Sequence, residues 1–257
     1  MLENPGCNAA RNRACWVSDR ILSNSLSSLR ASLRFVVDLL VPHDCFVCGH
    51  ESGGVLLCTE CAGELPVVGP ACPMCALPSP GAMVCGACLS APPAFDATFA
   101  AFPYAFPIDR MVQALKYRYR LSVVPFLAEA LIALGPVDGV DRVLPMPLHV
   151  KRLRERGFNQ AVELARPLAR VRGLPLELVQ VGRVLDVAPQ MSLSWRERQS
   201  NMRGVFDCAG RFDGAHVLVV DDVMTTGATL HALAAVLKKQ GASRVTNLVV
   251  ARTPRMS

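Results

Sequence analysis

Residues 216–229 read HVLVVDDVMTTGAT, and this stretch decides the fold of the chain. The apolar run 217–220 ends in two carboxylates, Asp221 and Asp222, and a loop of threonine, glycine and alanine then leads into a helical pattern. This order predicts a buried strand, a loop and the N-terminus of a helix. Because a helix N-terminus offers unpaired N–H groups and the positive end of a dipole, the stretch indicates a phosphate-binding site.

The residue types of the loop fit this interpretation. Gly227 lets the backbone approach a ligand closely, and the threonines at 225, 226 and 229 add hydroxyl donors. The two acids lie where the strand ends, which is the edge at which open α/β sheets bind ligands. The alternative is an ordinary strand end with an Asp helix cap, but a cap requires neither two acids nor a Thr-Thr-Gly loop.

The same stretch resembles the 5-phosphoribosyl-1-pyrophosphate (PRPP) signature of type I phosphoribosyltransferases. The resemblance implies that the catalytic pair Asp221 and Asp222 holds the ribose hydroxyls, with Mg²⁺ nearby. It also implies that the loop holds the 5′-phosphate of PRPP through Thr225, Thr226, Gly227, Ala228 and Thr229.

Eight of the 11 cysteines form four Cys-x-x-Cys pairs, which group into two modules of equal spacing, 45–61 and 72–88. Four thiolates suit tetrahedral Zn²⁺ in a closed, structural site, so the spacing predicts two zinc ions. Redox-active dithiols, iron–sulfur ligation and interleaved ligand pairs are the alternatives that spacing leaves open. The predicted ligands are Cys45, Cys48, Cys58, Cys61, Cys72, Cys75, Cys85 and Cys88.

Composition sets the broad class of the protein. A chain of 257 residues, 51% of them hydrophobic, can bury a core in one or two domains. The formal charge of +6 would fall to about +2 if eight thiolates bound two Zn²⁺, so charge alone says little about nucleic acid. We find no membrane-spanning run and no secretory signal, and paired cysteines favour metal in a reducing compartment; we therefore expect a cytoplasmic protein.

Apolar periodicity, the cysteine spacing and the resemblance to phosphoribosyltransferases together divide the chain into four parts. We expect disorder over 1–20, an amphipathic helix over 21–41, a double zinc-ribbon module over 42–93 and a phosphoribosyltransferase-like domain over 94–257. In the last part, strands alternate with helices, which predicts an α/β fold with a parallel sheet. Strands are expected at 97–105, 142–145, 174–180, 205–208, 217–222 and 244–251, and helices at 108–117, 123–134, 159–172, 194–201 and 228–240.

A basic segment follows the strand predicted at 142–145. Lys151, Arg152, Arg154 and Arg156 could surround a polyanion, although a solvated basic turn is the common alternative. In a chain with a PRPP signature, we interpret 147–157 as the pyrophosphate loop, with Lys151, Arg152 and Arg156 as its binding residues.

The cysteine region, the run Arg-Gly-Phe-Asn-Gln at 156–160 and a later pattern together resemble the ComF family, the competence-associated ComFC/GntX-like group. That pattern comprises Arg183, Gln190, Leu193, Arg198, Asn201 and Gly204-Val-Phe206. The resemblance covers about 38–252. It implies a zinc-ribbon region joined to a phosphoribosyltransferase-like domain, with a role in DNA uptake where single-stranded DNA is internalised or handled.

Segment 183–206 lies where phosphoribosyltransferases often carry a mobile loop. We interpret Arg183, Gln190, Arg198 and Asn201 as a candidate lid over bound PRPP; a solvated surface loop is the alternative.

Three functions remain open on the sequence. The first is ribosyl transfer from PRPP to a nitrogenous acceptor, with release of pyrophosphate. The second is a non-enzymatic DNA-uptake factor that binds single-stranded DNA and responds to PRPP or a nucleotide. The third is a scaffold for a partner such as a DNA-translocating helicase or another competence protein.

Overall fold

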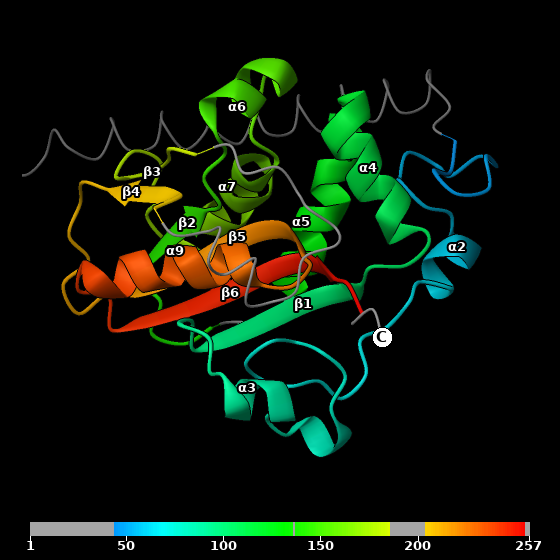
Figure 1. Ribbon diagram of the computed structural model, residues 1–257. Coiled ribbons are helices and arrows are strands. Elements are labelled where there is room, and N and C mark those ends of the chain that lie inside the picture. The colour runs from blue at the N-terminus through cyan, green and yellow to red at the C-terminus, as the bar shows by residue number, and fades with distance from the viewer. Residues whose placement is uncertain (1–43, 136, 186–203, 255–257) are drawn as a thin grey trace, which may run out of the picture. The chain divides into compact units, whose positions relative to one another are not determined.

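The structure is a computed structural model that describes residues 44–135, 137–185 and 204–254 (Figure 1). The chain divides into two compact units, Met1–Glu64 and Leu65–Ser257. Each unit contains one of the two cysteine modules. The segments predicted at 1–20, 21–41 and 194–201 lie outside the described residues.

The second unit is built on a four-stranded sheet in the order β1-β6-β5-β2, and every neighbouring pair of strands is parallel. The strands are β1 (Ala97–Pro103), β2 (Arg142–Pro145), β5 (His216–Met224) and β6 (Arg244–Arg252). The central strands β5 and β6 are almost entirely buried, in keeping with their apolar runs 217–220 and 248–251. The predicted parallel sheet is confirmed.

The register brings the carboxyl ends of the strands to one edge of the sheet. Pro145 at the end of β2 pairs with Val220, and Met224 at the end of β5 pairs with Arg252. The chain after β2 therefore leaves the sheet level with Val220, next to the two acids, while β5 continues to Met224. We call this edge of the sheet the carboxyl edge.

Helices cover both faces of the sheet (Figure 1). The helix α9 (Ala228–Lys239) lies on one face, while α5 (Val124–Ala133) and α7 (Gln160–Arg172) lie on the other. These helices form because their apolar side chains recur every three or four residues; α7, for example, buries Ala161, Leu164 and Leu168. The helix α4 (Ile108–Arg118) precedes α5, and the short η2 (Leu121–Val123) joins them.

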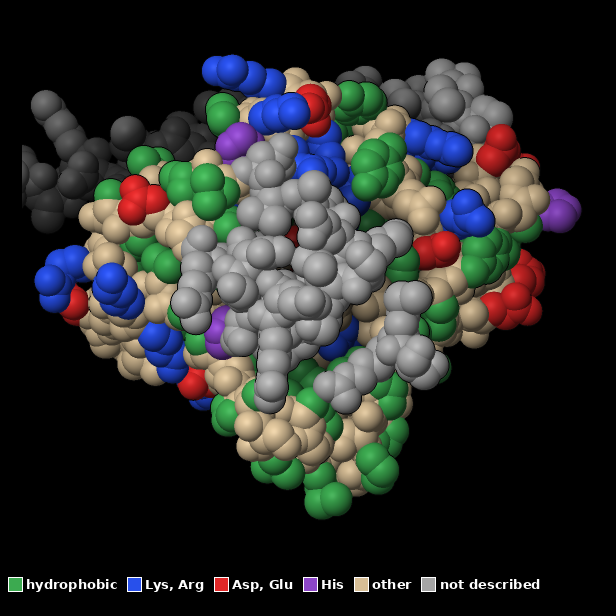
Figure 2. All heavy atoms as spheres, viewed as in Figure 1, with side chains coloured by type: hydrophobic (Ala, Val, Ile, Leu, Met, Phe, Trp, Pro, Cys, Tyr) green, Lys and Arg blue, Asp and Glu red, His purple; other side chains and the backbone are tan. Residues whose placement is uncertain are grey.

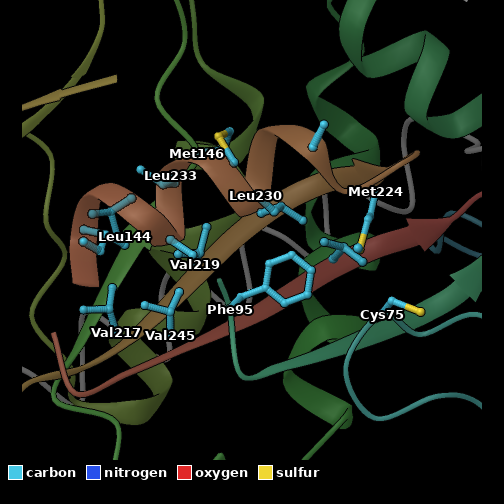
Figure 3. Close-up of a cluster of buried hydrophobic side chains, with 14 of the residues drawn as sticks. Cys75, Phe95, Leu144, Met146, Val217, Val219, Met224, Leu230, Leu233 and Val245 are labelled. Atoms are coloured by element: carbon cyan, nitrogen blue, oxygen red, sulfur yellow. The ribbon is translucent and has the colours of Figure 1, made fainter. Parts of the chain in front are cut away.

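The face under α9 holds the main hydrophobic cluster (Figure 3). Leu230 and Leu233 of α9 belong to the same buried cluster as Val217 and Val219 of β5 and Val245 of β6. Alternate residues of β5 thus contribute to the core on this face.

Two expectations from the sequence were wrong in detail. Segment 147–157 contains a helix, α6 (Val150–Arg156), because Lys, Arg, Leu and Glu favour helices and Gly157, at φ 69°, ends it. The strand expected at 174–180 lies later, as β3 (Val181–Arg183), which pairs antiparallel with β4 (Phe206–Cys208). The earlier residues contribute one bridge, between Leu176 and Val143.

Within the residues that the structure describes, every helix is too short or too polar to cross a bilayer.

Candidate functional site

The two acids of the signature lie at the carboxyl edge, near the end of β5. Asp222 is 3% exposed, and Asp221 is half-buried. Asp221 accepts a hydrogen bond from the backbone N–H of Asp222 through Oδ1, at 2.8 Å. Asp222 Oδ1 lies 2.9 Å from Lys116 Nζ, whereas its Oδ2 is buried and has no hydrogen-bond partner among the described residues. Buried oxygens rarely remain unpaired, so Asp222 Oδ2 is an open hydrogen-bonding position among the described residues.

Lys116, near the end of α4, is a site residue that the sequence analysis missed. Burial would lower its pKa, but the charge and hydrogen bond of Asp222, followed by the charge of Asp221, raise the pKa overall. The ammonium group is therefore charged and fixed beside both carboxylates. One signal could have found it, because Lys116 follows Val112 by four residues and so continues the buried stripe of α4.

Asp221 has an unusual titration. Burial first, and then the negative charge of Asp222, raise the pKa of Asp221 to about 7, although Lys116 opposes the shift. Two carboxylates this close resist simultaneous ionisation. The pair is thus well placed to interact with a hydroxyl group or a cation.

The phosphate loop occupies the turn between β5 and α9. Gly227 has a φ of 82° and is the N-cap of α9. The N–H of Ala228 donates to Thr226 Oγ1 at 3.4 Å, while Thr225 is exposed. The N–H groups of the first turn of α9, which have no acceptor within the helix itself, lie at this same edge.

The basic segment leaves the sheet beside the acids. The N–H of Met146 donates to Val220 O at 2.8 Å, so the chain after β2 remains attached to β5. On α6, Lys151 is exposed, and Arg152 and Arg156 are half-buried. Figure 2 shows lysine and arginine side chains gathered at the position of α6, at the top of the view.

Arg156 contacts two side chains, Gln160 and Tyr117. Its Nη1 donates to Gln160 Oε1 at 2.9 Å, and its guanidinium lies 5.5 Å from the ring centroid of Tyr117. The structure therefore brings three predicted parts, the acids, the phosphate loop and the basic segment, to one edge of the sheet.

The candidate lid is described only at its two ends. Arg183 lies in β3 opposite Phe206 of β4, with its guanidinium 5.9 Å from the Phe206 ring centroid. Gln190, Arg198 and Asn201 lie outside the described residues.

The eight cysteines form two groups of four, and each group is consistent with a structural zinc ion. In each group the four Sγ atoms lie within 4.8 Å of one another. The first group is Cys45, Cys48, Cys58 and Cys61, and the second is Cys72, Cys75, Cys85 and Cys88. The thiols are therefore grouped sequentially along the chain, which does not fit the interleaved alternative.

Both groups share one local architecture. Cys48 and Cys58 have their Sγ atoms 3.7 Å apart, and those of Cys75 and Cys85 are 3.6 Å apart. Zn–S bonds of about 2.3 Å give tetrahedral edges of nearly this length. In each module a short helix begins directly after the first cysteine of the second pair and contains the second cysteine. These helices are α2 (Thr59–Gly63) and α3 (Gly86–Ser90), and η1 (Pro80–Ala82) precedes α3.

Backbone donors favour the thiolate form of the first cysteine in each module. Burial by itself would raise the pKa of Cys45, but backbone hydrogen bonds from Cys48, Cys58 and Val47 lower it to about 6. The pKa of Cys72 falls to about 7 in the same way. Since thiolates are the form that binds zinc, these turns are suited to a metal.

Comparison with known proteins agrees with both parts of this arrangement. Residues 36–89 match the double zinc ribbon domain, and residues 155–255 match the phosphoribosyl transferase domain. Among solved structures, a purine phosphoribosyltransferase from Pyrococcus horikoshii is 20% identical, with a TM-score of 0.29, over 56% of this chain and 73% of that one. The predicted fold class, a phosphoribosyltransferase-like α/β domain with a zinc-ribbon module, is confirmed by the two domain matches and the parallel sheet.

Two relatives match most of the chain. The DNA utilization protein YhgH of Salmonella typhimurium is 32% identical over 228 residues, which cover 84% of this chain and 99% of the relative. Competence protein F of Haemophilus influenzae is 29% identical over 212 residues, 78% of this chain and 86% of the relative. The chain contains both domains in this order, and it matches these two relatives over most of their length. The chain therefore belongs to the ComF family.

Proposed function

We propose that the carboxyl edge binds PRPP together with Mg²⁺. One observation carries the proposal: Asp222 Oδ2 is buried without a hydrogen-bond partner among the described residues, at the edge of the sheet from which the loop 225–229 and the basic segment also start. A ribose hydroxyl, or a water molecule on Mg²⁺, would supply the missing donor. Carboxylates beside a helix N-terminus and a basic segment suit a sugar that carries phosphate groups at both ends.

Each part of the site takes one part of the ligand. Asp221 and Asp222 bind the ribose hydroxyls, and Lys116 fixes the orientation of Asp222. The loop 225–229 binds the 5′-phosphate through backbone N–H and hydroxyl donors. Lys151, Arg152 and Arg156 bind the pyrophosphate, whose charge Mg²⁺ would help to neutralise when bound.

Ribosyl transfer is the reaction that this arrangement suits. The bond from the anomeric carbon to pyrophosphate breaks, the electron pair leaves with pyrophosphate, and a nitrogenous acceptor forms the new bond to that carbon. Positive charge develops on the ribose, next to the carboxylates, while the basic segment stabilises the departing anion. Holding both ends of PRPP orients the anomeric carbon. We expect this activity in the cytoplasm, where thiols stay reduced and available to zinc.

Calorimetry with PRPP and Mg²⁺ tests the proposal. We expect micromolar binding, about −8 kcal/mol, to the zinc-loaded protein. Binding should be lost in an Asp221→Asn/Asp222→Asn variant and retained in Asp138→Asn/Asp213→Asn, which removes two exposed acids outside the carboxyl edge. Absence of binding to the folded wild-type protein, or equal binding to both variants, would overturn the proposal.

A second observation favours single-stranded DNA as a further ligand of the same region. Tyr117 and Tyr119 are 67% and 58% exposed and alternate with Arg118 and Arg120. The Tyr119 hydroxyl donates to Glu155 O at 2.9 Å, which places these aromatic rings beside the cations of α6. Exposed aromatic rings among cations can stack bases while the cations contact the DNA backbone.

Fluorescence anisotropy with a labelled oligonucleotide tests this second function. We expect binding that weakens steeply with salt, and a loss of about tenfold or more in Tyr117→Ala/Tyr119→Ala. Phe99→Ala removes another exposed aromatic ring, on β1, and is the matched control. Binding that is equal in all three proteins would exclude this surface.

A further inference from the structure

A buried arginine links the second cysteine module to the phosphate loop. Arg252 is the last residue of β6 and is 6% exposed. Its Nε donates to Cys75 O at 2.7 Å, and its Nη1 donates to Met224 O at 3.0 Å and to Thr253 O at 2.8 Å. Thr225 O shares the two N–H groups of the same Nη1 with the carbonyls of Met224 and Thr253. One guanidinium therefore binds carbonyls of three separate places in the chain.

These carbonyls belong to two parts of the proposed binding and metal sites. Cys75 is one of the four thiols of the second four-cysteine site, and Met224 and Thr225 begin the phosphate loop. A guanidinium is planar and presents its N–H groups in a fixed fork, so it sets the spacing between the groups that it binds. Hydrogen bonds from a charged donor are also stronger than those from a neutral one.

Hydrophobic packing also connects the second cysteine module with Met224 at the end of β5. Cys72, Cys75 and Cys88 belong to one buried cluster with Phe95 and Met224, and Cys75, Phe95 and Met224 are labelled in Figure 3. A backbone bond adds to this contact, because the N–H of Thr98 in β1 donates to Pro73 O, inside the turn 72–75, at 3.0 Å. A displacement of turn 72–75 would therefore reach Arg252 through a packed core.

We propose that Arg252 is a positioning residue that couples metal occupancy of the second four-cysteine site to the geometry of loop 225–229. With the four thiols joined through a metal, turn 72–75 is closed and the carbonyl of Cys75 has one position. Arg252 then fixes the carbonyls of Met224 and Thr225 relative to the carbonyl of Cys75. An effect of this coupling on phosphate binding rests on the proposed function. The effect on the conformational order of loop 225–229 does not.

Hydrogen exchange in an Arg252→Lys variant tests the arginine directly. Lysine keeps the charge but cannot hold several carbonyls in a planar fork. We expect exchange across 224–229 to accelerate about tenfold, with β1 and α5 unchanged and both metal ions retained. Arg244→Lys, the same substitution at the exposed start of β6, should leave the loop unchanged. No change in the loop, or equal acceleration throughout the domain, would refute the coupling.

A pair of cysteine variants tests the metal. Cys75→Ser disturbs the second site and Cys48→Ser the equivalent position of the first, which lies in the other compact unit. Loop exchange should accelerate in Cys75→Ser only. Equal effects of both variants would contradict the proposal; if Cys75→Ser does not fold, Arg252→Lys still decides.

PRPP affinity, measured in parallel, separates the two proposals. If the wild-type protein does not bind PRPP, the proposed function fails, while the exchange result still decides the coupling. If the wild-type protein binds PRPP and Arg252→Lys binds it equally well, the coupling to the phosphate site is wrong.

Discussion

Asp221 is a residue whose ionisation opposes folding. Its pKa of about 7 in the folded protein lies well above its value of about 4 in an unfolded chain. Between these pH values the folded state binds more protons than the unfolded state, so stability falls as pH rises and levels off above about pH 7. A ligand group that pairs with the carboxylates would offset this cost, as is common in binding sites.

Replacing Asp221 with asparagine, which cannot ionise, should remove this dependence. We expect Asp221→Asn to exceed the wild-type protein in stability by an amount that grows from about pH 4 to about pH 7 and is constant above. Urea unfolding of both proteins at several pH values measures the difference. A difference that is independent of pH, or that shrinks as pH rises, would show that Asp221 titrates normally.

Lys116 should matter more than an ordinary surface lysine. Lys116→Met leaves the buried Asp222 without its cation, and we expect a loss of about 3 kcal/mol in the free energy of unfolding. The control is Lys238→Met, because Lys238 pairs with Asp96 at 2.8 Å in a more exposed setting, where loss of a pair costs at most about 1 kcal/mol. Urea unfolding compares the two, and equal losses would contradict a special role for Lys116.

At the scale of the element, the strand–loop–helix unit from β5 to α9 depends on one glycine. Gly227 has a φ of 82°, a conformation that disfavours side chains, and an added Cβ would lie 2.5 Å from Met224 Cε. Met224 is flexible but only 2% exposed, so moving it disturbs a packed cluster.

Gly227→Ala should therefore cost more than a change in φ preference alone. Gly214 has a φ of 71° with nothing within 4 Å of an added Cβ, so Gly214→Ala should cost about 1 kcal/mol of stability. We expect Gly227→Ala to cost about 1 kcal/mol beyond that and to weaken PRPP binding. Thermal unfolding and calorimetry measure both quantities; if the two variants behave alike, the loop tolerates a side chain.

At the scale of the whole molecule, the two cysteine modules have different surroundings although their local structures match. The second module shares a buried cluster with the sheet and α9, whereas the first belongs to a separate compact unit. Two modules of the same spacing therefore stand in two different structural contexts.

A fragment of residues 65–257 should consequently fold by itself. We expect it to retain one zinc ion per chain and a single cooperative unfolding transition, because its core and its four-cysteine site lie within one unit. Metal analysis and circular dichroism of the purified fragment test this. A fragment that is unfolded, or that holds no metal, would show that the first unit is needed for the fold.

Features that depend on neighbours along the chain could be predicted from the amino-acid sequence. Strand β5, the loop at Gly227 and helix α9 follow from apolar periodicity and turn chemistry over about a dozen residues. The cysteine spacing likewise predicted two four-thiol sites, since each module spans only the residues 45–61 or 72–88. The family could be named because these local motifs occur in a fixed order.

Which buried groups meet became apparent only from the packing of distant segments. Lys116 reaches Asp222 from another helix, and Arg252 reaches Cys75 across 177 positions of sequence. The structure also established that α6 forms within the basic segment and that the thiols of the cysteine modules are grouped sequentially. Such partners cannot be predicted from the spacing of residues along the chain. A buried charge pairs with whichever group the packing of the sheet and helices brings within hydrogen-bond distance.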